Sequence, residues 1–408
     1  MKKAFFSLLI ITLLVLPLPY ISAWDWGLLM DQTAGLESVA GGEVIDGFSY
    51  IGTLIPWFST PLRDAGSFYL SGGASLEYDS GKPIFVPELL RTEFNYRIRE
   101  YMEISAGRIP YTDPVGFIAS GLFDGARLSL DTGYGNVGVG FWYTGLLYKK
   151  NAQITMTGND MAIYTSTLDY TNFMDTYFSS RRLVAAIDWE YLDIKEWLSL
   201  KLAFIGQFDL NGQDEKYHSQ YLAAKASIPV RNFAFNIGGT LEFMEITGIS
   251  QQFKIGLAGE LGAAWMPPSS IPDQLSLTAR FSSGTFNSGN TLAAFVPITT
   301  EAQGDVLSAK LSGLSMIRLE YSARLHDTFS INVASSYFIL SDLATYKGPP
   351  PGREGHFLGN EFSGRLTWSP FSDLRLSLGG GIFLPFMGNA DKGDPVWRIN
   401  LNALVVIF

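Results

Sequence analysis

The sequence contains no cysteine, and few of its residues are charged. Without a thiol, the chain can form no disulfide, carry no cysteine-linked lipid anchor and perform no thiol chemistry. Charged residues make up 17% of the 408 residues, whereas a soluble domain averages about 25%. Beyond Leu18, no uninterrupted apolar run reaches the roughly 18 residues that a membrane-spanning helix requires. The acidic formal net charge of −10 also disfavours nucleic-acid binding.

The first 23 residues have the pattern of a secretory signal peptide. Lys2 and Lys3 precede an apolar segment, 4–18, which is too short for a comfortable membrane span. A small residue, Ala23, stands where a signal peptidase would cut. We therefore expect export, cleavage after Ala23 and a mature chain of residues 24–408; the alternative is an N-terminal membrane anchor.

Apolar and polar residues alternate through long segments of the mature chain. In 317–325, for example, Ile317 and Leu319 share one face while Arg318 and Glu320 point the other way. A low-charge chain without apolar helices satisfies its backbone in lipid only as a closed β-barrel. The segments have at least the roughly 9 to 11 residues that a tilted transmembrane strand needs. The fold class is therefore all-β, an up-and-down antiparallel transmembrane barrel of about 18 strands, with 16 as the alternative. The 18 segments are 25–34, 46–55, 67–78, 88–98, 101–109, 122–131, 136–147, 182–191, 197–208, 217–228, 232–244, 253–265, 274–284, 314–325, 329–340, 360–369, 374–386 and 396–408.

Short and long connections alternate along most of the chain. The longest are 148–181, 285–313 and 341–359, which we expect to be extracellular loops, because outer-membrane barrels have short periplasmic turns and long outer loops. One exception is 266–273, a Pro-rich link of moderate length that falls where a short turn belongs.

The leader, the period-two strands and the last segment together resemble a bacterial outer-membrane porin. The last segment, 396–408, ends in Phe408. In that family a terminal Phe is the signal read by the barrel-assembly machinery, so the resemblance implies that partner, a lipid environment and passage of a small polar solute. Gly107-Arg108, 113–117 and Phe123-Asp124-Gly125 faintly resemble alginate-export-type barrels, which also have 18 strands.

The face opposite the apolar one is expected to line the lumen, because a charge facing mid-bilayer lipid costs about 2 to 4 kcal/mol. Its basic members slightly outnumber its acidic ones, which favours anionic or sugar-like solutes, since charged rings select by sign. Arg365 and Arg375 are expected to face each other across one turn. The alternative is that these charges pair across strands and only hold the wall together. The pore-lining candidates are Arg91, Glu93, Arg97, Glu103, Arg127, Lys201, Lys254, Glu260, Arg280, Arg318, Glu320, Arg324, Arg365, Arg375 and Arg398.

The long loop 148–181 is rich in aromatic residues. A loop of this length is usually functional or disordered. We expect it to fold inward as a constriction on which sugar rings could stack, the alternative being a solvated outer loop with local packing. Loop 341–359 is expected to be an exposed cap. The constriction candidates are Tyr164, Tyr170, Phe173, Tyr177 and Phe178.

An enzyme is not expected. The three histidines show no metal spacing, and His218 and Ser219 are adjacent in a strand, so their side chains point to opposite faces. We predict no cofactor and no metal. Beside diffusion of polar solutes, two functions stay open: a closed barrel acting as an adhesin or structural protein, and a transporter of hydrophobic ligands. The latter requires an N-terminal hatch, for which only the irregular stretch 31–45 leaves room.

Overall fold

The computed structural model describes residues 24–38, 47–63, 65–79, 82–194, 197–212, 215–248, 251–285, 292–343, 345, 355–388 and 394–408. The predicted signal peptide 1–23 lies outside these residues, as do 286–291 and 346–354 of the predicted loops. Among the described residues, no helix is long and apolar enough to cross a membrane.

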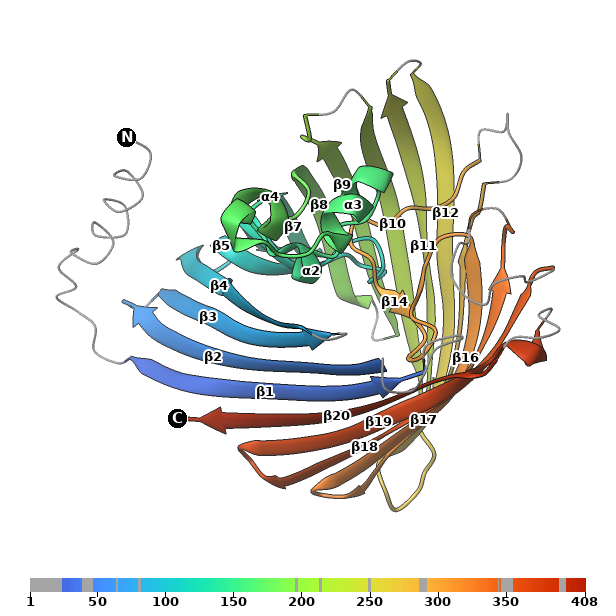
Figure 1. The fold of residues 1–408 in the computed structure, drawn as a ribbon. Helices are drawn as coiled ribbons and strands as arrows, with labels where there is room; N and C mark the ends of the chain where they lie inside the picture. The colour runs from blue at the N-terminus through green and yellow to red at the C-terminus, as the bar shows by residue number, and fades with distance from the viewer. Residues whose placement is uncertain are drawn as a thin grey trace.

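One antiparallel sheet of 18 strands closes on itself (Figure 1). Each strand pairs with its neighbours in the chain, and β1 pairs with both β2 and β20. The predicted barrel and its strand number are thereby confirmed. The first half of the wall is β1 (Asp25–Glu37), β2 (Phe48–Leu62), β3 (Gly66–Asp79), β4 (Lys82–Arg99), β5 (Met102–Thr112), β6 (Ser120–Thr132), β7 (Gly135–Tyr143), β8 (Arg182–Ile194) and β9 (Leu198–Asp209). The second half is β10 (Lys216–Val230), β11 (Phe233–Thr247), β12 (Gln252–Trp265), β13 (Asp273–Ser282), β16 (Leu314–His326), β17 (Phe329–Leu340), β18 (Phe357–Phe371), β19 (Leu374–Leu384) and β20 (Val396–Ile407).

The remaining elements lie in the connections. They are α2 (Lys149–Ala152), α3 (Gly158–Thr165), the 3-10 helix η2 (Tyr170–Asn172), α4 (Phe173–Tyr177), the two-residue strands β14 (Ala302–Gln303) and β15 (Ala309–Lys310), and the 3-10 helix η3 (Pro385–Met387). The short connections gather at one end of the barrel, here the turn end, and the long ones at the other, the loop end. Leu28 near the start of β1 pairs with Ile407 near the end of β20, so both ends of the wall lie at the turn end.

The strands follow the predicted segments, with differences at their ends. The seventh stops at Tyr143 rather than 147, because the chain turns inward at Thr144, where backbone and side chain bond to 180–182. The nineteenth element stops at Leu384, where Pro385 opens the 3-10 helix η3. The first strand begins at Asp25 and belongs to the wall, so residues 31–37 of the proposed hatch region 31–45 form no hatch; residues 39–45 lie outside the described residues.

The outer surface of the wall is apolar. In β16, Ile317, Leu319 and Leu325 are about half exposed on the outside, while Arg318 and Glu320 between them point into the lumen and are paired there. Burial instead concentrates inside the cylinder toward the loop end, where Ile118, Ile205 and Phe295 are among the core residues with no exposed surface. A porin-type wall does not need an apolar interior, so this inner core must come from loops that enter the lumen.

Candidate functional site

Three connections fold into the lumen and interlock: residues 113–119, the helical segment 144–181, and residues 292–313 (Figure 1). The Ile118 carbonyl accepts the backbone N–H of Ile298 at 2.7 Å. The Thr300 N–H donates to the Gln153 carbonyl at 3.1 Å. The three segments thus form one inner body, which we call the lumen insert.

The first segment of the lumen insert is held by its own aspartate. The Asp113 carboxylate accepts four backbone N–H groups, from Val115, Gly116, Ile118 and Ala119, at 2.8 to 2.9 Å. Burial raises the pKa of Asp113, while the four donors act in the opposite direction. Closed on itself in this way, the segment can leave β5 and reach across the lumen, where Val115 lies against Gly238 of β11.

The third segment is held at two places on the wall. On one side, the buried Glu242 of β11 accepts the Val296 N–H at 2.7 Å. On the other, the buried Glu361 of β18 accepts the N–H groups of Asp305, Val306 and Leu307 at 2.6 to 3.0 Å. Residues 292–313 therefore cross the lumen. That 285–313 is an extracellular loop stays a prediction; its described residues 292–313 fold into the lumen, where their apolar side chains are buried against the inner wall.

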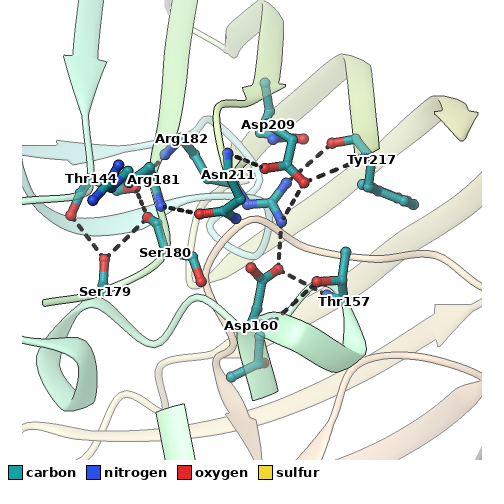
Figure 2. A network of polar contacts seen from close by, with 12 residues as sticks. Thr144, Thr157, Asp160, Ser179, Ser180, Arg181, Arg182, Asp209, Asn211 and Tyr217 are labelled. Atoms are coloured by element: carbon teal, nitrogen blue, oxygen red, sulfur yellow. Dashed lines mark hydrogen bonds and ion pairs between the residues drawn. The ribbon is translucent and has the colours of Figure 1, made fainter. Parts of the chain in front are cut away.

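The second segment is anchored by a fully buried ion pair (Figure 2). Arg182 of β8 contacts Asp160 of α3 at 2.5 Å and Asp209 of β9 at 3.3 Å, and all three side chains are at most 4% exposed. Thr157 and Asp160 form a capping box at the start of α3, which fixes Asp160 on its helix. An arginine with two carboxylates can hold helix and wall together because each buried charge has a partner.

The aromatic residues of 148–181 cover a strand edge. From Lys82 to Arg91, β4 pairs with β3 but not with β5, since the β4–β5 register begins at Thr92. The hydroxyls of Tyr170 and Tyr177 donate to the carbonyls of Phe85 and Pro87 on that free edge.

Phe173 stacks on Tyr177 at 4.5 Å between centroids, Phe178 meets Tyr177 edge-on at 5.0 Å, and Tyr164 lies separately over Lys150. Four of the five aromatic candidates are thus brought together, packed on each other and on β4. Their role as a constriction stays a prediction.

Two cavities flank the lumen insert. One, of about 390 Å³, lies beneath residues 112–116. In it Arg127 pairs with Asp188 at 2.5 Å, and Lys201 pairs with Glu190. Further round the same wall, Glu260 accepts from Arg280 at 2.7 Å and lies 3.5 Å from Lys225. We call this side of the lumen the paired wall.

The other cavity, of about 330 Å³, lies between the lumen insert and β16–β20, which we call the open wall. Arg318 contacts Asp305 at 3.1 Å and Glu320 at 2.8 Å, and Arg398 contacts Glu37 at 2.6 Å. Arg365 also lines this cavity, yet within the described residues no carboxylate lies at ion-pair distance from it. Beside it, Gly379 leaves the wall bare, since a Cβ there would be 3.5 Å from the Arg365 Nε.

The other predicted lining residues lie elsewhere on the inner wall. Arg91 pairs with Glu93 along β4, and Arg97 and Glu103 are direct register partners on β4 and β5. Arg324 contacts Asp327 at 3.6 Å at the turn end. The sequence also placed Lys254 on β12 and Arg375 on β19; neither forms an ion pair with a described residue.

The expected facing of Arg365 and Arg375 is wrong: the turn falls at 372–373, where Phe371 pairs with Leu374, so the register puts Gly379 opposite Arg365.

Several residues of the site were not anticipated. Asp305 and Asp113 lie in connections, where the period-two pattern gives no direction, although Asp113 before Pro114 and Gly116 is a local turn signal. Lys225 was missed because its neighbours Ala224 and Ala226 are too small to mark the lipid face clearly. Among the described residues, no group of three or more potential metal ligands is present.

No family model matches the chain, and no curated protein shows significant sequence similarity to it. Solved structures do resemble it. OccK2 (OpdF) of Pseudomonas aeruginosa in complex with glucuronate superposes with a TM-score of 0.62 at 13% identity, over 95% of this chain and 99% of that one. OpdK of Pseudomonas aeruginosa with vanillate gives 0.62 at 10% identity, again over 95% and 99%. A BenF-like porin from Pseudomonas fluorescens Pf-5 gives 0.62 at 10% identity over the same shares.

The fold is that of the outer-membrane porins. At such identities the likeness shows the fold alone. Together with the apolar exterior of the closed wall, it confirms the expected class of integral outer-membrane barrel. The porin-type barrel thus has a wall made for lipid and a lumen narrowed from within by the lumen insert, with cavities on both sides.

Proposed function

We propose that the protein is an outer-membrane channel for the diffusion of small polar solutes, with a preference for anionic or sugar-like ones that carry a carboxylate. The proposal includes export by the leader 1–23 and insertion through the terminal Phe408. The single observation that carries the solute preference is the unpaired Arg365 in the cavity of the open wall.

Arg365 differs from the other cations around it because no carboxylate of the described residues lies at ion-pair distance from its guanidinium; the charge of Asp305 acts on it only from farther away. Arg318 and Arg398 are each satisfied by carboxylates of the chain, Asp305 and Glu37 among them. An unpaired guanidinium that faces a water-filled cavity offers a planar fork of donors, which suits a carboxylate better than a point charge would.

The surroundings of Arg365 favour a small, flat ligand group. Gly379 projects no side chain beside the guanidinium, and Asn332 and Asn400 line the same cavity with amide donors and acceptors. Hydroxyl-bearing solutes can therefore bond to the amides while a carboxylate meets Arg365. Glucuronate and vanillate, the ligands named with two of the similar structures, are both carboxylates with hydroxyl groups.

The test is a reversal-potential measurement on the full-length protein in planar bilayers under a KCl gradient, comparing the wild type with Arg365→Gln. A unit positive charge about 8 Å from a passing ion in water stabilises an anion by ~0.5 kcal/mol and destabilises a cation by the same amount. Because the two effects add in the ratio, loss of the charge should lower the anion-to-cation permeability ratio by about fivefold. Liposome swelling with gluconate and with glucose should show the anion slowed more than the neutral sugar.

The matched control is Arg375→Gln. Arg375 has the same chemistry, lies on the neighbouring strand β19 and lines neither flanking cavity. If the two substitutions change the permeability ratio equally, Arg365 has no special role and only the general charge of the lumen matters. A wild-type protein that conducts no ions and swells no liposomes would overturn the channel itself.

A further inference from the structure

The largest cavity described for the lumen lies at the turn end, away from the lumen insert. It has a volume of about 710 Å³ and is bounded by the inner faces of β13, β16, β17 and β18. Its floor is the Pro-rich connection Met266–Pro272, visible in Figure 1 as the yellow loop that extends beyond the wall below β16. We call this connection the lip and the cavity the turn-end chamber. Its volume is that of a typical small-molecule pocket.

The backbone conformation of the lip is restricted by prolines and by hydrogen bonds at both of its ends. Pro267, Pro268 and Pro272 restrict its backbone. At its ends, the Met266 N–H donates to the Asn232 carbonyl at 2.8 Å, and the Arg324 N–H donates to the Pro272 carbonyl at 2.9 Å. A turn of this length with fixed ends gives a preformed floor, so a ligand in the chamber would not have to order it.

The chamber combines apolar surface with cations. Met266, Pro267 and Ile271 of the lip give one side an apolar face. The inner wall supplies Arg324 and Arg365. Only one carboxylate, Asp273, is among the described residues that line it, and that group is already engaged by the hydroxyls of Tyr321 at 3.1 Å and Ser269 at 2.6 Å. The exposed contact of Arg324 with Asp327, at 3.6 Å, is of the weak surface kind.

The chamber adjoins the cavity of the open wall. Arg365 and Asn332 line both cavities. Along β16, Arg318 lies on the loop-end side of this junction and Arg324 on the turn-end side, six residues further along the strand and on the same inward face. Arg365 is therefore shared by the two cavities, with Arg318 in one and Arg324 in the other.

We propose that the turn-end chamber is a second solute-binding site, selective for carboxylates that carry an apolar ring or short chain. The carboxylate lies between Arg365 and Arg324, and the apolar body rests on the lip. This proposal rests on the proposed channel function and adds to it a second site in series, with a different preference: hydroxyl-bearing groups near Asn400, apolar groups at the lip.

The experiment is block of single-channel current in planar bilayers, with probes added from the turn-end side. Cyclohexanecarboxylate has both the charge and the apolar body, acetate has the charge alone, and cyclohexanecarboxamide has the body alone. We expect cyclohexanecarboxylate to block at lower concentration than either. Arg324→Gln should weaken that block about tenfold, as expected for loss of a charge-assisted hydrogen bond. Ile271→Ser should weaken it roughly threefold and leave acetate unchanged.

Arg375→Gln again serves as the control, because Arg375 is a turn-end arginine that does not line the chamber. Correct folding of each variant is checked by its heat-modifiable mobility and strand content. If cyclohexanecarboxylate blocks the current of Arg324→Gln and of Ile271→Ser at the same concentration as that of the wild type, the second site does not exist. The channel proposal would still stand if Arg365→Gln alters ion selectivity. Conversely, weakened block in these variants with unchanged selectivity in Arg365→Gln would retain the chamber as a site and remove the role given to Arg365.

Discussion

The paired wall and the open wall both carry basic and acidic side chains, but these side chains serve different purposes. Beneath residues 112–116, Arg127 contacts Asp188 across the intervening strand β7, and Lys201 contacts Glu190 on the neighbouring strand β8. Across the lumen, Arg365 forms no ion pair with any residue that the structure describes, and it faces a cavity beside Gly379, which projects no side chain. Charges on adjacent strands that neutralise each other hold a wall together, whereas a charge left without a partner is available to a solute. Pairing, and not the count of arginines, therefore distinguishes the two sides.

The largest expected effect comes from breaking the anchor on the paired side. Arg182→Ala leaves Asp160 and Asp209 buried without their partner, and removal of one member of a buried ion pair costs about 3 to 5 kcal/mol. We expect a lower unfolding midpoint in denaturant and faster proteolysis within 149–178. Arg181→Ala, at the adjacent and exposed position, should change neither. Equal stability of the two variants would mean that the lumen insert does not depend on this contact.

A second change removes part of the lumen insert from the open wall. A Cβ at Gly381 would lie 2.6 Å from the Phe362 carbonyl oxygen and 2.8 Å from the Val306 Cγ2, so Gly381→Val should strain β18 and push residues 305–307 away from Glu361. The buried carboxylate then loses its donors, at a cost of about 1 to 3 kcal/mol. We expect larger and noisier single-channel conductance.

The control for this change is Gly379→Ala, because the added methyl would meet its neighbours only at ordinary contact distance. A conductance that is the same in both glycine variants would show that residues 305–307 do not limit the current.

The smallest effect concerns pH. Burial would raise the pKa of Asp305, but the hydrogen bond from Ser363 and the charge of Arg318 outweigh it, so the pKa lies below its ordinary value. A depressed carboxyl pKa stabilises the folded arrangement above the ordinary value of about 3.9, and this contribution disappears as the pH falls through the folded pKa. Conductance noise should therefore stay constant from neutral pH to about pH 4 and rise below it. In Asp305→Asn this rise should be smaller, and an unchanged rise would assign it to other carboxylates.

The sequence predicted the wall far better than the lumen. Lipid on one side and water on the other impose a period of two over long strands, so segments such as 253–265 and 329–340 are found close to their predicted ends. No comparable periodic pattern predicts where the loops fold. Residues 292–313 enter the barrel because of partners far away in the chain, such as Glu361, which binds a segment 54 to 56 residues earlier.

The sequence predicted which face of a strand the charged residues of the site occupy, but not which residues they contact. Alternation correctly put Arg318 and Glu320 on one face, yet it could not say that Asp305 would meet Arg318, or that Gly379 would lie opposite Arg365. The place of the turn and the register shift between Trp368 and Phe371 decide which residue lies opposite Arg365, and both depend on turn geometry rather than on hydrophobicity. The contact of Asp305 with Arg318 depends instead on how the connection 292–313 folds.

The pairing of β1 with β20 makes the two ends of the chain structurally inseparable. Leu28 to Glu37 lie along Ile407 to Arg398, so β20 completes the seam of the cylinder with β1. Before β1 and β20 pair, the barrel has two strand edges with unpaired N–H and C=O groups. Exposure of such groups to hydrocarbon costs free energy, because lipid offers them no hydrogen-bond partner. Deletion of β1 or β20 would therefore open the barrel. Chain ends usually tolerate shortening well, but here we expect deletions in these two strands to be tolerated least.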